Sequence, residues 1–99
     1  MKPILLAFFG TLTLACADQF QIREANGNAK TDLGYAAVKV MGPQGNVLFE
    51  GRTDKYGRIS INKLQNKTYE AVVTFGSRTA KVDLPVTGDN TRLKEALIK

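Results

Sequence analysis

The stretch from Gly45 to Phe75 (GNVLFEGRTDKYGRISINKLQNKTYEAVVTF) constrains the fold most, because it alternates apolar and polar residues between short turn sequences. Residues 47–53, 58–62 and 69–75 each repeat with a period of two, which is typical of half-buried β-strands. Many of these residues are β-branched or aromatic, which also favours strands. The stretch therefore predicts three short strands joined by two tight turns.

The first of these turns carries the strongest local signal. Asp54 can accept hydrogen bonds from the backbone two residues on, and Gly57 can adopt a positive φ at little cost. The strand that follows places Ile59 and Ile61 on one face. We therefore predict a hairpin at the Asp54–Gly57 turn, with the neighbouring strands added beside it.

The pattern in this stretch resembles the core of the carboxypeptidase regulatory-like domains, which belong to the wider transthyretin-like and prealbumin-like set. The resemblance covers roughly residues 34–84, and it has one departure: Lys67 stands where the family usually has Gly. It implies an all-β fold, a single antiparallel β-sandwich of about seven short strands, Ig-like or transthyretin-like. The residues that carry it are Thr53, Asp54, Gly57, Arg58, Ile59, Ile61, Leu64, Tyr69, Val73 and Gly76.

The N-terminal segment predicts export. Lys2 precedes the uncharged residues 4–15, a run too short to span a bilayer but typical of the apolar region of a signal peptide. Cleavage after Ala17 would remove residues 1–17 and leave residues 18–99 as the domain. Alternatively, residues 1–15 are a lipoprotein signal, and Cys16 carries the lipid. Both routes predict a periplasmic or secreted protein, and the second predicts one that is anchored to the membrane.

The segments before the central stretch read as strand, loop and strand. Residues 18–25 alternate around Phe20 and Ile22, which predicts a first strand at a sheet edge. Residues 26–34 are rich in Asn, Gly and Asp, which predicts a loop. Residues 35–41 are apolar on both faces, which predicts a central strand that buries either its two valines or Tyr35 and its alternate neighbours.

The segments after the central stretch predict one further strand and an ambiguous tail. Residues 78–84 alternate cleanly, and we expect the strand to end there because Pro85 cannot donate to a ladder and Gly88 favours a turn. Residues 89–99 contain good helix formers at helical spacing. The resemblance implies a closing strand instead, and we favour the strand.

Composition excludes several classes of protein. A chain of 99 residues with 43% hydrophobic and 23% charged residues is an ordinary single globular domain. The net charge of +5 is scattered along the chain and forms no block, so we predict no nucleic-acid partner.

The residues for catalysis and for metal binding are also missing. The chain contains no His, which removes Ser-His-Asp and Cys-His catalysis and most zinc sites. Cys16 is lost or lipidated on either processing route, so no thiol nucleophile remains. Asp54 alone supplies too few oxygens for calcium. We therefore predict no catalytic residue, no cofactor and no metal site.

Two further constellations have weak support. Glu50 and Glu70 are predicted on neighbouring strands, but nothing suggests a cleft that would raise one pKa. The collagen-adhesin B-type domains join a Lys to an Asn with a buried Glu assisting, and Lys39, Glu70 and Asn90 could be cast in those roles, although their positions match no motif.

The function predicted is that of a non-catalytic exported interaction module of a bacterial envelope, which binds a protein or glycan through a sheet face, an edge or loops. Candidate contacts are Lys39, Tyr56, Arg58 and Arg78. One alternative is a small accessory subunit, inhibitor or immunity protein of an envelope enzyme. Another is a small hydrolase of the transthyretin-like set, which the missing histidines disfavour. The only membrane contact expected is a lipid at Cys16.

Overall fold

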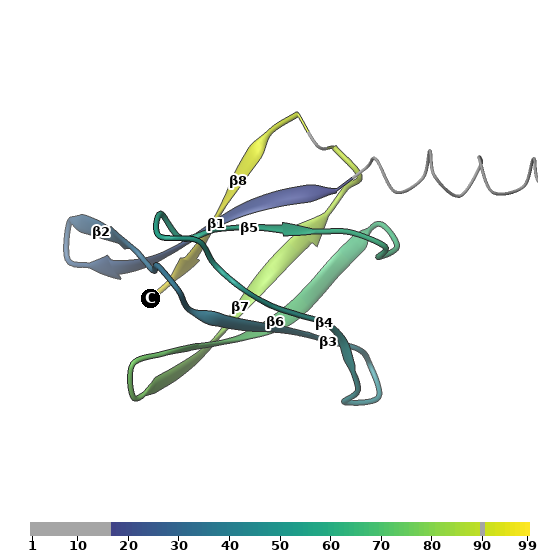
Figure 1. Cartoon of the computed structure of the whole chain (residues 1–99), viewed down its shortest axis with the longest axis horizontal. Helices are drawn as coiled ribbons and strands as arrows, with labels where there is room; N and C mark the ends of the chain where they lie inside the picture. Colours follow the sequence, from purple (N-terminus) through teal and green to yellow (C-terminus); the bar gives the residue numbers. More distant parts are fainter. Residues whose placement is uncertain (1–16, 90) are drawn as a thin grey trace, which may run out of the picture.

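The computed structural model describes residues 17–89 and 91–99, and within them it consists of strands, turns and loops (Figure 1). No helix in this part of the chain is long and apolar enough to cross a membrane. Two sheets form a sandwich, which confirms the predicted all-β class. The strands are β1 (Asp18–Asn26), β2 (Ala29–Asp32), β3 (Ala37–Met41), β4 (Val47–Arg52), β5 (Arg58–Ile61), β6 (Lys67–Phe75), β7 (Arg78–Val86) and β8 (Leu93–Ile98).

The first sheet is built around β1, which pairs with three strands. On one side β5 and β2 pair antiparallel with its first and second halves, and on the other side β8 pairs with it in parallel. The prediction that this strand lies at an edge is therefore wrong. Phe20 and Ile22 are fully buried, while the opposite face of β1 is polar. The alternation of apolar and polar residues along β1 therefore does not differ from that of an edge strand.

The second sheet has the strand order β4-β3-β6-β7 and is antiparallel throughout. The prediction that β3 is central is confirmed, and Val38 and Val40 are its inward residues, both with no exposed surface. Tyr35 precedes the strand and is 64% exposed. Lys39, which lies between the two valines, is exposed on the opposite face of the strand.

The turn at Asp54 and Gly57 exists, but it does not make a hairpin. It carries the chain from β4 in the second sheet to β5 in the first, and β6 then returns to the second sheet (Figure 1). The predicted hairpin is therefore wrong, although the strands on either side of it are present. Local alternation specifies that a strand forms, whereas its partner depends on which surfaces the rest of the chain offers.

Of three smaller predictions, the closing strand of the tail is confirmed, and the other two are wrong in part. The expected loop at residues 26–34 contains β2, whose residues are all exposed and therefore show no alternation. Pro85 lies inside β7, opposite Thr68, and is tolerated because β7 is an edge strand that needs no donor on its open side. The tail forms the strand β8, with Ala96 and Ile98 buried against the core.

The core lies between the two sheets and draws residues from both. The ring of Phe20 and the side chains around it have almost no contact with solvent. The buried apolar residues are Phe20, Ile22, Leu33, Ala36, Val38, Val40, Ile59, Ile61, Tyr69, Ala71, Val73, Leu84, Val86, Ala96 and Ile98.

One carboxylate is buried at the end of this core. Asp18 is 1% exposed, and its carboxylate accepts hydrogen bonds from the backbone N–H groups of Thr87 (2.7 Å) and Gly88 (2.9 Å). It also forms an ion pair with Lys94 Nζ (2.6 Å). Burial alone would raise the pKa of Asp18, but the hydrogen bonds from Lys94, Thr87 and Gly88 outweigh it and hold the pKa below its ordinary value. The contacts tie β1 in the first sheet to the end of β7 in the second.

Candidate functional site

Two loops from different parts of the chain are joined by hydrogen bonds near the middle of β1. The Thr53 hydroxyl donates to the Leu33 carbonyl oxygen (2.7 Å) and accepts from the Ala36 N–H (2.8 Å). The backbone adds bonds from the Thr53 N–H to the Ala36 oxygen (2.9 Å) and from the Tyr35 N–H to the Asp54 oxygen (3.2 Å). We call these segments the paired loops; they are residues 33–36 and 53–57.

Asp54 holds the second of the paired loops in shape. Its Oδ1 accepts hydrogen bonds from the backbone N–H groups of Tyr56 (2.8 Å) and Arg58 (2.9 Å), which is the turn-forming role predicted for it. The hydrogen bond from the Arg58 N–H lowers the pKa of Asp54 most, and the bond from the Tyr56 N–H lowers it further. Within the described residues, no three His, Cys, Asp or Glu side chains are grouped so that they could hold a metal ion.

Exposed tyrosines and cations lie on the paired loops and on the strand residues that directly adjoin them. Tyr35 and Tyr56 are 64% and 50% exposed. The charged groups of Lys55 and Arg58 lie 5.1 Å and 5.5 Å from the centre of the Tyr56 ring. Arg52 donates from Nη1 to the Tyr35 carbonyl oxygen (2.8 Å). We call these five residues the tyrosine patch.

Tyr35 adopts a backbone conformation that is unusual for its side chain. Its φ is +57°, in the left-handed region, where a bulky L-residue costs about 1–2 kcal/mol. The bonds to Asp54 and Arg52 hold it there, although its side chain is exposed and contributes little to the core. Gly34 permits the bend, since a Cβ at that position would lie 2.7 Å from the Lys55 carbonyl oxygen.

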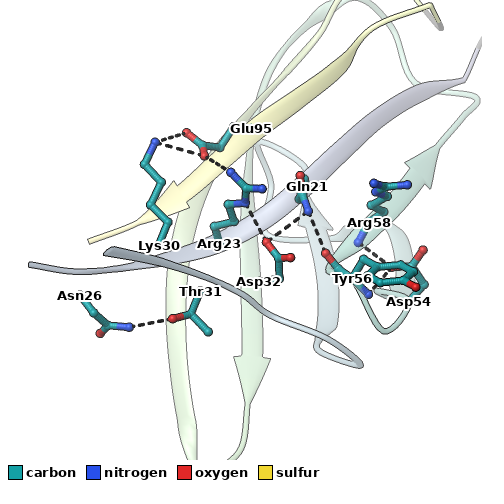
Figure 2. Close-up of polar contacts among 10 residues, drawn as sticks. All are labelled: Gln21, Arg23, Asn26, Lys30, Thr31, Asp32, Asp54, Tyr56, Arg58 and Glu95. Atoms are coloured by element: carbon teal, nitrogen blue, oxygen red, sulfur yellow. Dashed lines mark hydrogen bonds and ion pairs between the residues drawn. The ribbon is translucent and has the colours of Figure 1, made fainter. Parts of the chain in front are cut away.

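Gln21, on β1 of the first sheet, is hydrogen-bonded to one residue of the patch, Tyr56 (Figure 2). Gln21 is 9% exposed, and its Nε2 donates to the Tyr56 carbonyl oxygen (3.0 Å) and to Asp32 Oδ1 (3.2 Å). This amide therefore connects the tyrosine patch to β1 and β2. It fixes the backbone of Tyr56 while leaving its ring in solvent.

An ion-pair network continues from Asp32 across the same face (Figure 2). Arg23 Nε lies 2.7 Å from Asp32 Oδ1, and its Nη1 lies 3.1 Å from Glu95 Oε2. Lys30 Nζ lies 3.2 Å from Glu95 Oε1. The bonds from Lys30 and then Arg23 lower the pKa of Glu95. Since all four side chains are partly exposed, the network orients β2 and β8 on β1 more than it stabilises the fold.

The structure brings together only some of the contacts predicted from the sequence. Tyr56 and Arg58 both lie in the tyrosine patch. Lys39 lies on the outer face of the second sheet, opposite Glu50. Arg78, at the start of β7, forms an ion pair with Glu24 and lies 5.0 Å from the Phe75 ring. These two residues therefore belong to other surfaces.

The sequence does not identify three members of the patch as candidate contacts: Tyr35, Arg52 and Lys55. Tyr35 was interpreted as part of a strand, because apolar residues follow it directly. Its positive φ gives no sequence signal, since Gly or Asn would be the expected residue there. The proximity of Gly34 to Lys55 depends on the pairing of the two loops, which local patterns do not encode.

The weaker constellations do not assemble. Glu50 and Glu70 flank β3 on opposite sides, so the prediction that their strands are neighbours is wrong. Lys39 and Glu70 are exposed, unlike the buried pair that a Lys–Asn bond with an assisting Glu requires. Asn90, Cys16 and all of the predicted leader except Ala17 lie outside the described residues.

A cavity of about 500 Å³ opens at the other end of β5, beside Asp18. Its lining includes the apolar side chains of Ile61, Leu64 and Val86 and several side-chain amides. Its one buried charged group is already bonded to Thr87, Gly88 and Lys94. The exposed, cationic tyrosine patch therefore remains the better candidate for a binding site.

The coupling of the paired loops through Thr53 can be tested by substitution. Thr53→Val should lower the free energy of unfolding by about 2 kcal/mol, because the Ala36 N–H and the Leu33 oxygen lose their buried partner. Thr53→Ser retains the hydroxyl and should cost less than about 1 kcal/mol. Urea denaturation measures both values, and equal losses in the two variants would contradict the role of the hydroxyl.

The chain matches no family model and no curated protein. The carboxypeptidase regulatory-like family is therefore not confirmed. Among solved structures, the crystal structure of S.CueP aligns with a TM-score of 0.54 and 18% sequence identity, over 84% of this chain and 60% of that chain. The chain thus spans about 60% of the length of that structure. At this identity the likeness shows a shared two-sheet β fold.

Proposed function

We propose that this chain is an exported, non-catalytic binding module that holds an anionic ligand, protein or glycan, on the tyrosine patch. The observation that carries the proposal is the pair of exposed tyrosines on rigid, hydrogen-bonded loops beside Arg52, Lys55 and Arg58. Tyrosines on a backbone that is already fixed lose less conformational entropy when they bind, and guanidinium groups pair well with carboxylates.

A glycan that carries carboxylates is the ligand class that fits the patch best. The flat apolar faces of sugar rings can stack on exposed tyrosine rings, while the cations take up the acidic groups. The net charge of +5 favours the approach of such a polymer. An acidic polypeptide offers the same charge without the stacking surfaces.

Export forms part of the proposal and is supported by the apolar N-terminal segment of the sequence. β1 begins at Asp18, directly after the predicted cleavage site at Ala17. A lipid on Cys16 would leave Ala17 as the only residue between the anchor and the sheet. We therefore favour cleavage after Ala17 and a ligand outside the cytoplasm.

The experiment measures binding of polygalacturonate by isothermal titration calorimetry. Poly-glutamate and neutral dextran are titrated in the same way for comparison. We expect binding to polygalacturonate that weakens as salt is added, because exposed charges are screened. The double variant Y35A/Y56A should weaken that binding by about tenfold or more, which corresponds to about 1.4 kcal/mol. Dextran should not bind.

The matched control is K39Q, which removes an exposed cation outside the patch and should leave the affinity unchanged. Tighter binding to poly-glutamate than to polygalacturonate would indicate an acidic protein partner instead. If Y35A/Y56A binds every acidic polymer as tightly as the unaltered chain does, the tyrosine patch is not the site.

A further inference from the structure

The two edges of the second sheet differ in the residues that keep another strand from pairing with them. β7 carries Lys81, Asp83 and Pro85, which discourage another strand from pairing with its open side. β4 has no Pro and no Lys, and it begins with Val47 and Leu48, which are 46% and 38% exposed. Among the described strands, β4 pairs only with β3. Its other side is an open edge.

The open edge of β4 is regular over a short stretch. A β-bulge displaces its start, and the register with β3 is continuous over residues 49–52. The Thr53 N–H donates to the Ala36 oxygen on the side of β3. Because backbone groups alternate in direction along a strand, the N–H and C=O groups of Glu50 and Arg52 point away from β3, to the open side.

We propose that β4 pairs antiparallel with β4 of a second copy of this chain, with Glu50 opposite Arg52 of the partner subunit. A two-fold axis at Gly51 generates this register and creates two such pairs. Both residues present free N–H and C=O groups, so they can form hydrogen-bonded pairs of an antiparallel ladder. The Gly51 positions of the two copies face each other without a side chain between them on the inner face, toward which a Cβ at Gly51 would point.

Charge selects this register over its neighbours. A shift by one residue in each chain would place Glu50 opposite Glu50 of the partner subunit, or Arg52 opposite Arg52 of the partner subunit. Like charges directly opposite each other destabilise a sheet, whereas opposite charges stabilise it. A shift that moves inward residues opposite outward ones is excluded because the pleat has a period of two. The edge is therefore complementary to itself in one register.

The dimer would join the two second sheets into one continuous sheet. It would also bring two tyrosine patches near the axis, because Arg52 belongs both to the patch and to the paired edge. A repeating glycan could then occupy both patches at once, which raises the avidity. Pairing through β4 does not itself depend on the proposed ligand, so each proposal can fail without the other.

Sedimentation equilibrium of the protein as isolated from cells, measured over a range of protein concentrations, tests the proposal. We expect a reversible dimer. E50R and R52E should each weaken dimerisation by about tenfold, because each replaces two opposite-charge pairs with two like-charge pairs. The double variant E50R/R52E restores the pairs and should dimerise like the unaltered chain. K81E, on the β7 edge, is the matched control and should change nothing.

A second measurement fixes the register. Separately prepared E50C and R52C chains, mixed and oxidised, should form a mixed disulfide far faster than either forms alone, since opposed Cα atoms about 5.5 Å apart suit a disulfide. Circular dichroism confirms that each variant is folded. A monomer at every concentration, an E50R variant that dimerises normally, a double variant without rescue, or mixing that adds no cross-link would each overturn the proposal.

Discussion

Asp18→Ala should lower the free energy of unfolding by about 3 kcal/mol. The substitution leaves the N–H groups of Thr87 and Gly88 without an acceptor and the Lys94 ammonium without its counter-charge. Removing one partner of a buried charged network costs more than the network contributes, because the other groups stay desolvated. For a domain whose total stability is about 5–15 kcal/mol, this is a large fraction. Urea denaturation at pH 7 measures it.

The control for this substitution is Asp83→Ala. Asp83 is exposed on β7 and lies opposite Glu70, so its removal should change stability by less than about 0.5 kcal/mol and could raise it. Intact mass of both variants establishes that they begin at the same residue. A loss for Asp18→Ala no larger than that for Asp83→Ala would show that the buried carboxylate is not needed.

The same carboxylate predicts how stability depends on pH. The folded pKa of Asp18 lies below its ordinary value of 3.8, so the charged form is the one that folding stabilises. Its contribution is complete above the unfolded pKa and is lost as the pH falls through the folded pKa. The difference in unfolding free energy between the unaltered chain and Asp18→Ala should therefore be constant above about pH 5 and shrink below about pH 4. A difference that does not vary between pH 7 and pH 3 would contradict this.

Gly57→Ala should be the second large effect, with a loss of about 3 kcal/mol. Gly57 has a φ of +80°, and a Cβ there would lie 2.7 Å from the Ile22 carbonyl oxygen and 3.0 Å from the Leu33 nitrogen. These are backbone atoms, which cannot move aside as a side chain can. The Gly57 oxygen also accepts the hydrogen bond of the Ile22 N–H (2.8 Å), which holds the turn against β1.

Gly45→Ala separates the two causes of that loss. Gly45 has nearly the same φ, +82°, but a Cβ there would meet nothing within 4 Å. It should therefore cost only the backbone strain, about 1 kcal/mol. Thermal or urea unfolding of both variants gives the difference, which measures the close approach of the turn to β1. Equal losses would mean that strain alone keeps glycine at position 57.

Several features of the site follow from the sequence alone. The turn at Asp54 was predicted because a carboxylate followed by Gly57 at that spacing closes on the local backbone, whatever surrounds it. The strands of the central stretch were predicted from their period of two, which reflects one buried and one solvated face. Tyr56 and Arg58, in and directly after that turn, were among the candidate contacts predicted from the sequence.

What the sequence by itself determined is therefore local: which segments are strands, where the turn forms, and that no histidine is present. The tertiary structure alone decided that this turn joins two sheets, that β1 is central, and that Tyr35 lies beside Arg52. The physical reason is that alternation depends on a residue's nearest neighbours along the chain. Strand partners and loop contacts depend on burial and hydrogen bonds between residues that are far apart in sequence and meet only when both sheets have formed.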